Sequence, residues 1–210
     1  MLVAGFDQSL NSSAVTFMEG GIPVGIEILR FHEGGSREAK LAALGAWWRG
    51  LLLFWKPAYV ALEDVHQRRG KGVKTAIDLG RVYGALAGAS CGTGPVVALA
   101  PVTWRSITCG DGGVDKAQVI AWVSARYGPG LTRKITDAVC AAMPAGQRPR
   151  VYGDVFESVG IAAAIHAYAA WRHDGVAGAD PKRIKCFKEI DCVLKEFSHG
   201  SSAGKISIRC

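Results

Sequence analysis

Four acidic residues stand at positions from which a folded chain could gather them into one cluster. Asp7 and Glu63 each end a short apolar run that is typical of a buried strand. Asp154 and Glu157 are three residues apart at the start of an alanine-rich stretch, so a helix would place both on one face. If the two apolar runs are neighbouring strands, Asp7 and Glu63 leave the sheet at the same edge. A helix laid across that edge would then complete the cluster.

Such a cluster indicates metal-dependent chemistry. Four carboxylates in a small volume repel one another and resist ionising together. Divalent cations remove this conflict, and oxygen ligands favour Mg²⁺ or Mn²⁺ over softer metals. Two such ions about 3.5–4 Å apart can hold the attacking water and the leaving oxygen of a phosphodiester. Taken singly, each acid could be a turn residue or a helix-end acid, but together they favour phosphodiester hydrolysis with two Mg²⁺ ions, for which Mn²⁺ would substitute.

Basic residues directly after the second acid indicate a nucleic-acid partner. Four cations, Arg68, Arg69, Lys71 and Lys74, lie within seven residues. Cations at this density suit the phosphates of DNA, although a solvated basic loop is the alternative. The whole chain of 210 residues carries a formal charge of +7, from 25 Lys and Arg against 18 Asp and Glu. This excess is compatible with a polyanionic partner but is weak evidence by itself.

The segments between these residues predict a mixed α/β domain. Alternation and turn signals predict strands at 2–6, 14–18, 24–29, 59–62 and 96–100, and helices at 36–55, 75–89, 115–127 and 154–171. The first three strands should form an antiparallel meander, which gives a five-stranded mixed sheet flanked by helices. We interpret 128–153 as a loop region with a short helix at 137–143. We predict a nuclease domain at 1–178 and a basic, weakly structured or flexible tail at 179–210.

Five short patterns in this order resemble the RuvC-type Holliday-junction resolvases, which have the ribonuclease-H-like fold. The patterns are Ala-Gly-Phe-Asp-Gln-Ser-Leu-Asn-Ser-Ser-Ala-Val at 4–15, Ala-Leu-Glu-Asp-Val at 61–65, Leu-Gly-Arg-Val-Tyr-Gly at 79–84, the pair Arg105 and Lys116 around a glycine loop, and Asp-x-x-Glu at 154–157 with the helix after it. The resemblance spans about residues 1–172. It implies a Mg²⁺-dependent homodimer that cuts four-way DNA junctions by paired symmetric nicks and leaves 5′-phosphate ends.

The resemblance also implies roles for single residues. Asp7, Glu63, Asp154 and Glu157 would be both catalytic and metal-binding, and Arg105 and Lys116 would contact DNA. The chain departs from the family at Glu157, where Asp is usual, and at His66, where an aromatic wedge commonly separates base pairs. An imidazole can still stack on DNA, but over a smaller surface. These departures, together with a long 128–153 segment and the tail after residue 180, suggest a phage or prophage member, for which branched DNA is the expected substrate class.

Other interpretations of the same residues stay open. An actin-like or sugar-kinase ATPase lobe shares a strand-end aspartate with a Ser/Thr turn, but it needs a second lobe and a second phosphate loop. A non-catalytic junction-binding protein would gain nothing from clustered acids. Asp137 is a rival for the final acid. The most apolar stretch, 41–55, is too short to span a bilayer, and the N-terminus lacks the pattern of a signal peptide, so a cytoplasmic location is expected.

Overall fold

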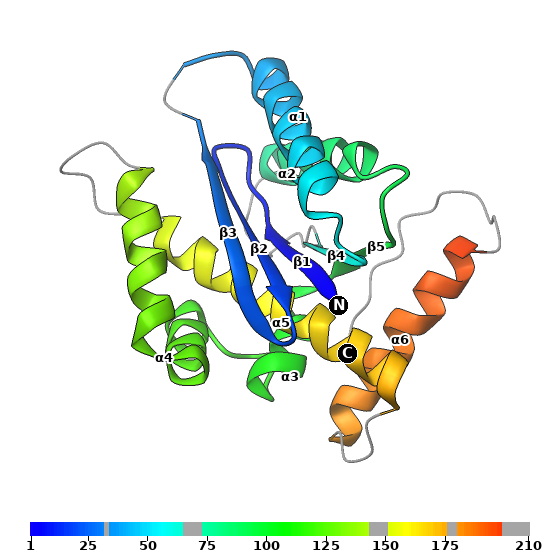
Figure 1. Ribbon diagram of the computed structural model, residues 1–210. Helices are drawn as coiled ribbons and strands as arrows, with labels where there is room; N and C mark the ends of the chain where they lie inside the picture. Colours follow the sequence, from blue (N-terminus) through cyan, green and yellow to red (C-terminus); the bar gives the residue numbers. More distant parts are fainter. Residues whose placement is uncertain (32–33, 65–72, 143–150, 176–179, 199–210) are drawn as a thin grey trace.

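A five-stranded mixed sheet forms the centre of the protein (Figure 1). The computed structural model describes residues 1–31, 34–64, 73–142, 151–175 and 180–198. The strands are β1 (Leu2–Asp7), β2 (Ser12–Glu19), β3 (Ile22–Arg30), β4 (Tyr59–Glu63) and β5 (Val96–Leu99), in the spatial order β3-β2-β1-β4-β5. The first three pair antiparallel as a meander, whereas β4 is parallel to both β1 and β5. The predicted five-stranded mixed sheet is therefore confirmed.

Helices cover both faces of this sheet. They are α1 (Arg37–Trp55), α2 (Val73–Ala89), α3 (Pro101–Cys109), α4 (Lys116–Ala141), α5 (Val151–Asp174) and α6 (Pro181–Ser198). The pleat of β1 sends Ala4 and Phe6 into the core under α1 and α2, and Val3 into the core shared with α5. The described helices include none long and apolar enough to cross a membrane.

Glycine at position 5 allows α5 to lie directly against β1. A Cβ atom at Gly5 would stand 2.1 Å from the backbone nitrogen of Ala162 in α5. No side chain fits in that space, because the neighbouring atom is backbone and cannot rotate away. The first strand and the helix that carries Asp154 and Glu157 are thus held at close range.

Two regions differ from the sequence-based expectation. The region 128–153 was expected to be mostly loop, but α4 continues through it to Ala141 and bends at Gly128, where φ is +75°. The Gly128-Pro129 pair resembles a loop signal, yet glycine can take this left-handed conformation and proline suits the first turn of the helical segment that follows. Residues 143–150 lie outside the described part of the chain.

The predicted tail is the second difference, because residues 181–198 form α6 rather than a weakly structured segment. Phe187 is buried and its ring centroid lies 5.5 Å from that of Trp171 on α5. Cys186, Ile190 and Leu194 are buried beside it. These positions follow a helical period, but the charged residues between them hide the stripe in the sequence. Residues 199–210 lie outside the described part.

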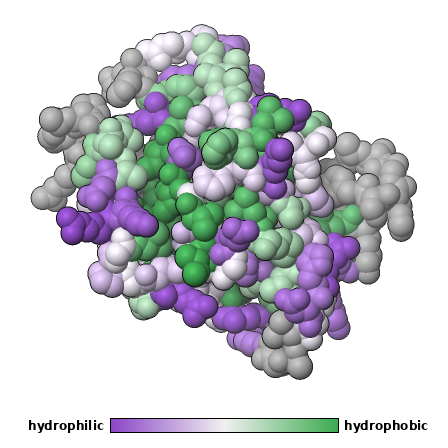
Figure 2. Space-filling model, in the orientation of Figure 1, coloured by the Kyte–Doolittle hydropathy of each residue, from purple (hydrophilic) through white to green (hydrophobic). Residues whose placement is uncertain are grey.

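The β3 side of the sheet is the less covered one. Every residue of this edge strand is partly or fully exposed, and Ile22 and Val24 are 64% and 47% exposed. Figure 2 shows hydrophobic side chains gathered over the middle of this face, where Figure 1 draws β3. The opposite end of the sheet order, β4 and β5, is instead buried between helices, and the candidate site lies at the β1–β4 pair.

Candidate active site

Adjacent parallel strands bring Asp7 and Glu63 to the same edge of the sheet. Phe6 of β1 pairs with Leu62 of β4, so the next residue of each strand stands at an equivalent position. Phe6 and Leu62 both point into the core under α1 and α2. Since side chains alternate along a strand, Asp7 and Glu63 point to the opposite face, where α5 lies. The strand pairing and the pleat therefore aim both carboxylates at α5.

Gln8 ties the two strand ends together. Its side-chain amide donates to the carbonyl oxygen of Glu63, and its side-chain oxygen accepts from the backbone N–H of Glu63 at 3.1 Å. Gln8 is buried, so this paired contact is shielded from competing water. The turn that follows is held by Ser9 and Ser13, whose side chains bond within it. Gln8 thus fixes the distance between the two acid-bearing backbones.

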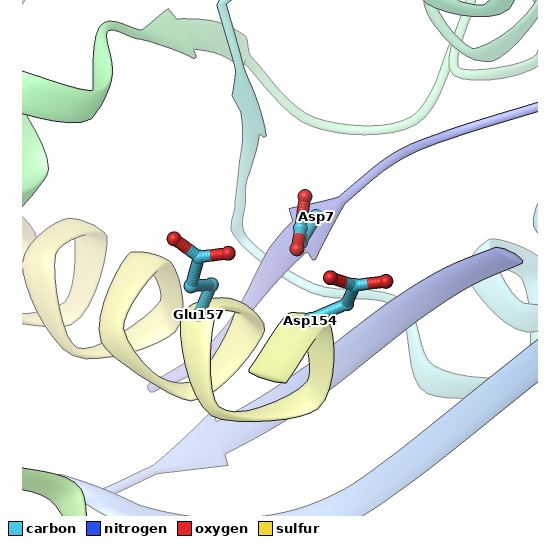
Figure 3. A group of neighbouring side chains, drawn as sticks. All are labelled: Asp7, Asp154 and Glu157. Atoms are coloured by element: carbon cyan, nitrogen blue, oxygen red, sulfur yellow. The ribbon is translucent and has the colours of Figure 1, made fainter. Parts of the chain in front are cut away.

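The first turns of α5 place Asp154 and Glu157 opposite Asp7. Figure 3 shows the three carboxylates converging, Asp7 from β1 and the other two from neighbouring turns of α5. One carboxylate oxygen from each residue lies within 4.8 Å of those of the other two. Glu63 stands beside this group, and its Oε1 accepts a hydrogen bond from the indole Nε1 of Trp104 at 3.1 Å. The structure therefore groups three of the four predicted acids, with Glu63 close enough to act on the charge of Asp7 and Glu157.

Two cations lie inside the acidic group. Arg105 of α3 donates through Nη2 to Oε1 of Glu157 at 2.6 Å. Lys116, at the start of α4, reaches Oδ1 of Asp154 at 2.6 Å and Oε2 of Glu157 at 2.7 Å. Arg105 is buried and its guanidinium lies 5.0 Å from the Trp104 ring centroid. Both oxygens of Glu157 are thus held by cations, which fixes its orientation.

Burial and mutual repulsion make the carboxylates hard to ionise. Burial first, and then the charges of Glu63, Glu157 and Asp154, raise the pKa of Asp7 well above its usual value. Burial and Glu157 raise the pKa of Glu63 to about 7, although the Trp104 hydrogen bond opposes this. Burial also raises the pKa of Asp154, against the effect of Lys116. The site is therefore unfavourable when all its carboxylates are ionised, and added positive charge would stabilise it.

The donor set fits divalent metal ions. Four carboxylates face two cations, so the fully ionised group keeps two negative charges. Carboxylate oxygens at this spacing are the ligands that Mg²⁺ and Mn²⁺ accept. Burial of Lys116 would by itself lower its pKa, but its bonds to Asp154 and Glu157 outweigh this and raise it. Lys116 is therefore charged throughout the neutral range and is a counter-ion of Asp154 and Glu157.

The remaining predicted DNA contacts are mostly outside the described residues. His66, Arg68, Arg69 and Lys71 fall in the segment 65–72, which is not described. The backbone of Lys74 lies in the first turn of α2. Asp137, the rival for the final acid, is exposed on α4 and does not belong to the group of Asp7, Asp154 and Glu157.

Sequence reasoning missed two residues of the site. Gln8 directly follows Asp7, and Trp104 directly precedes Arg105, so each stands next to a residue that was itself predicted to belong to the site. Neither residue type is a metal ligand of the expected kind, and their contacts depend on a partner that is distant in sequence. Only the strand register and the packing of α3 reveal them.

Comparison with known proteins gives the fold but no close relative. No protein-family model matches the chain, and no curated protein matches it by sequence. Solved structures do resemble it, and three of them show the extent of the likeness. Thermus thermophilus RuvC has a TM-score of 0.57 at 18% identity, over 83% of this chain and 97% of that chain. The T. thermophilus RuvC complex with a Holliday junction substrate has a TM-score of 0.61 at 19% identity, over 83% and 96%.

The third structure is the yeast mitochondrial Holliday junction resolvase Ydc2, with a TM-score of 0.52 at 13% identity, over 93% of this chain and 83% of that chain. The chain therefore has the fold of the RuvC-type Holliday-junction resolvases, and the predicted ribonuclease-H-like architecture is confirmed. The expected phage or prophage origin is not tested by this likeness.

Proposed function

We propose that the chain is a metal-dependent, structure-selective DNA endonuclease that cuts four-way junctions by paired symmetric nicks. The observation that carries the proposal is the group of carboxylates from Asp7, Asp154 and Glu157, with Glu63 beside it, at the sheet edge of a resolvase fold. A neighbour of the same fold was solved with a Holliday junction substrate, which supports branched DNA as the substrate class. Cutting of many branched substrates is the alternative within the same chemistry.

The four acids would hold two Mg²⁺ ions. When bound, these ions would activate the attacking water and stabilise the departing 3′ oxygen, which leaves a 5′-phosphate. The chain's own residues prepare this arrangement. Arg105 orients Glu157, and the hydrogen bond from the indole N–H of Trp104 favours the ionised form of Glu63. Lys116 balances Asp154 and Glu157, and it is half-exposed, so its ammonium can turn to a DNA phosphate when the acids gain other counter-charges.

DNA binding would extend from this site along the basic segment. His66, Arg68, Arg69, Lys71 and Lys74 follow Glu63 in the sequence, and we propose that they bind the phosphates of the DNA. Arg105 is buried against Trp104 and Glu157, so we assign it to positioning of Glu157 rather than to a first contact with DNA. We further propose a homodimer, because paired nicks on opposite strands require two sites in one assembly.

The decisive experiment is cleavage of a synthetic four-way junction beside matched duplex, flap and three-way substrates, with Mg²⁺ or with EDTA. We expect symmetric nicks on the four-way junction with Mg²⁺ only. Asp7→Asn removes one metal ligand without changing the size of the side chain, so it should abolish cleavage and keep DNA binding. Asp137→Asn, on the exposed face of α4, is the matched control and should cut normally.

Each outcome has a distinct meaning. Metal-dependent cutting of all branched substrates would keep the site and favour a broader debranching nuclease. Binding without any cutting would favour a non-catalytic junction-binding protein. Cleavage by pure Asp7→Asn protein at the wild-type rate would refute the assignment of the site.

A further inference from the structure

A polar cavity lies along the second half of α5, away from the acidic group at its start. Its volume is about 310 Å³, and it is lined by residues of β2, the β2–β3 turn, the end of α3, and parts of α4, α5 and α6. Its α5 residue His166 comes nine residues after Glu157, which is about 13 Å along the helix axis. Its volume is at the lower end of the range of about 300–1,000 Å³ for small-molecule sites. The cavity is therefore separate from the acidic group and large enough for a nucleotide-sized ligand.

Among the described residues, two arginines and no carboxylate line the cavity. Arg126 of α4 and Arg183 of α6 line it together with His166. Within the described residues, neither arginine forms an ion pair with a carboxylate, whereas Arg105 and Lys116 at the acidic group both do. Arg126 hydrogen-bonds the side chain of its neighbour Tyr127. Two guanidinium groups that share one cavity without acidic partners repel each other and favour an anionic ligand.

Arg183 carries a buried donor that lacks an acceptor. Its Nη2 makes a long hydrogen bond of 3.4 Å to the carbonyl oxygen of Thr108, and its Nε is buried without any hydrogen-bond partner among the described residues. A buried guanidinium donor left unsatisfied costs free energy. Arg183 also lines the cavity, and guanidinium groups bind phosphate through parallel N–H donors, so this side chain suits an anionic ligand.

Aromatic side chains form another part of the wall. Trp122 and Tyr127 line the cavity, with their ring centroids 6.1 Å apart in an edge-to-face arrangement. His166 is half-buried, and burial together with the nearby N-terminal ammonium lowers its pKa, so it is neutral above pH 7. Cations beside an indole are the combination that binds a phosphate together with the base or sugar attached to it.

We propose that this cavity binds a phosphate-bearing nucleotide unit, with Arg126 and Arg183 on the phosphate and Trp122 against the base or sugar. The phosphate belongs either to a DNA strand that passes beyond the acidic group or to a free nucleotide. The two arginines and the aromatic side chains of the cavity would bind either ligand. The proposal does not require cleavage by the acidic group, so it stands or fails separately from the nuclease function.

The test follows the indole signal of Trp122 by NMR in the full chain labelled with ¹⁵N-tryptophan, with EDTA present. Trp122→Phe identifies the signal. The probes are a short oligothymidylate, thymidine 5′-monophosphate, and thymidine as the phosphate-free control. We expect a saturable shift with a phosphate-bearing probe and none with thymidine. Arg126→Gln and Arg183→Gln should each weaken binding about 10-fold, because each loses a charge-assisted hydrogen bond.

Arg133→Gln is the matched control, since Arg133 is exposed on α4 and lies outside this cavity. It should change the affinity less than twofold, in line with a remote charge. A shift with the oligonucleotide alone identifies a DNA strand as the source, and a shift with the monophosphate as well identifies a nucleotide site. Both support the proposal. No shift with either probe, or equal weakening by Arg133→Gln, overturns it. If Arg183→Gln fails to fold, the exposed Arg126→Gln carries the test.

Discussion

The ionisation of Glu63 depends on the side chain of Trp104, which does not itself titrate. The indole N–H of Trp104 donates to Oε1 of Glu63, and this bond favours the ionised form of a carboxyl whose pKa burial raises to about 7. Trp104→Phe removes the donor and keeps an aromatic ring. We expect the rate of Mg²⁺-dependent cleavage at pH 7 to fall about 10- to 100-fold, the usual effect of losing a hydrogen bond to a charged group.

The pH profile distinguishes this positioning role from a loss of packing. Without the Trp104 bond the pKa of Glu63 rises further, so the acidic limb of the cleavage profile should move to higher pH. Trp171→Phe, in the core between α5 and α6, is the control and should leave that limb in place. A uniform rate loss with an unchanged profile would mean that Trp104 only fills space.

The raised pKa values also predict how stability depends on pH. In EDTA, Glu63 is neutral in the folded protein up to about pH 7, but it ionises near 4.5 once the chain unfolds. The folded state therefore binds more protons than the unfolded state between these values, and the free energy of unfolding falls as the pH rises through them. The pKa of Asp7 is raised as well and adds to the loss.

Thermal unfolding at several pH values measures this effect. Without metal, Tm should decrease from pH 5 to pH 8, and Glu63→Gln should make the decrease smaller. Mg²⁺ should raise Tm more at pH 8 than at pH 5, because ligands must lose their protons to bind it. An equal effect of Mg²⁺ at both pH values would argue against metal binding by these acids.

The acids could be predicted from the sequence, whereas their supports could not. Asp7 and Glu63 follow apolar runs, and Asp154 and Glu157 share a helical spacing, so local patterns were enough. Gln8 and Trp104 act through residues 55 and 41 positions away. Contacts at such separations depend on strand order and helix packing, which a local pattern does not contain.

At the scale of elements, the contact between β1 and α5 determines whether the site exists. Gly5 lets α5 lie against the strand that ends at Asp7, and an added Cβ would meet the backbone of Ala162 at about 2.1–2.5 Å. We expect Gly5→Ala to push α5 outward. The variant should lose at least about 1–3 kcal/mol of unfolding free energy, as overpacked cores do, and most of its cleavage activity.

Urea unfolding and the junction assay measure both effects of Gly5→Ala. Gly50→Ala is the control, because Gly50 is exposed in α1 and a Cβ there would meet nothing within 4 Å. It should be neutral or should stabilise the protein by up to about 1 kcal/mol, since alanine favours helix. Wild-type stability in Gly5→Ala would contradict the close approach of β1 and α5.

The elements themselves were predictable where one strong signal marks each boundary. Ser36 caps α1, and Asp115 and Gln118 form a capping box at the start of α4, so these helix starts were found within a residue or two. Residues 128–136 of α4 and all of α6 were missed, although a short helix was predicted at 137–143. The Gly128-Pro129 pair resembles a loop signal. The apolar stripe of α6 indicates a packed helix only once its contacts with Trp171 and Tyr168 of α5 are known.

At the scale of the whole molecule, the proposed function requires two active sites in one assembly. One site cuts one strand, so a paired cut requires two chains on one junction. A supercoiled plasmid with an extruded cruciform separates these cases, because paired nicks give linear DNA and a single nick gives an open circle. Wild-type protein should give mainly linear product.

Mixing wild-type with Asp7→Asn protein then tests the homodimer. At equal amounts and with free exchange of subunits, about half of the dimers carry one intact acidic group. These mixed dimers should nick one strand and release open circles, so the ratio of open circle to linear DNA should rise well above that of diluted wild-type protein. A mixture with the Asp137→Asn control should keep the wild-type ratio. If independent monomers cut the DNA, Asp7→Asn would act only as a diluent. The product ratio would then match that of wild-type protein at half the concentration, and the homodimer would have to be abandoned while the acidic site could stand.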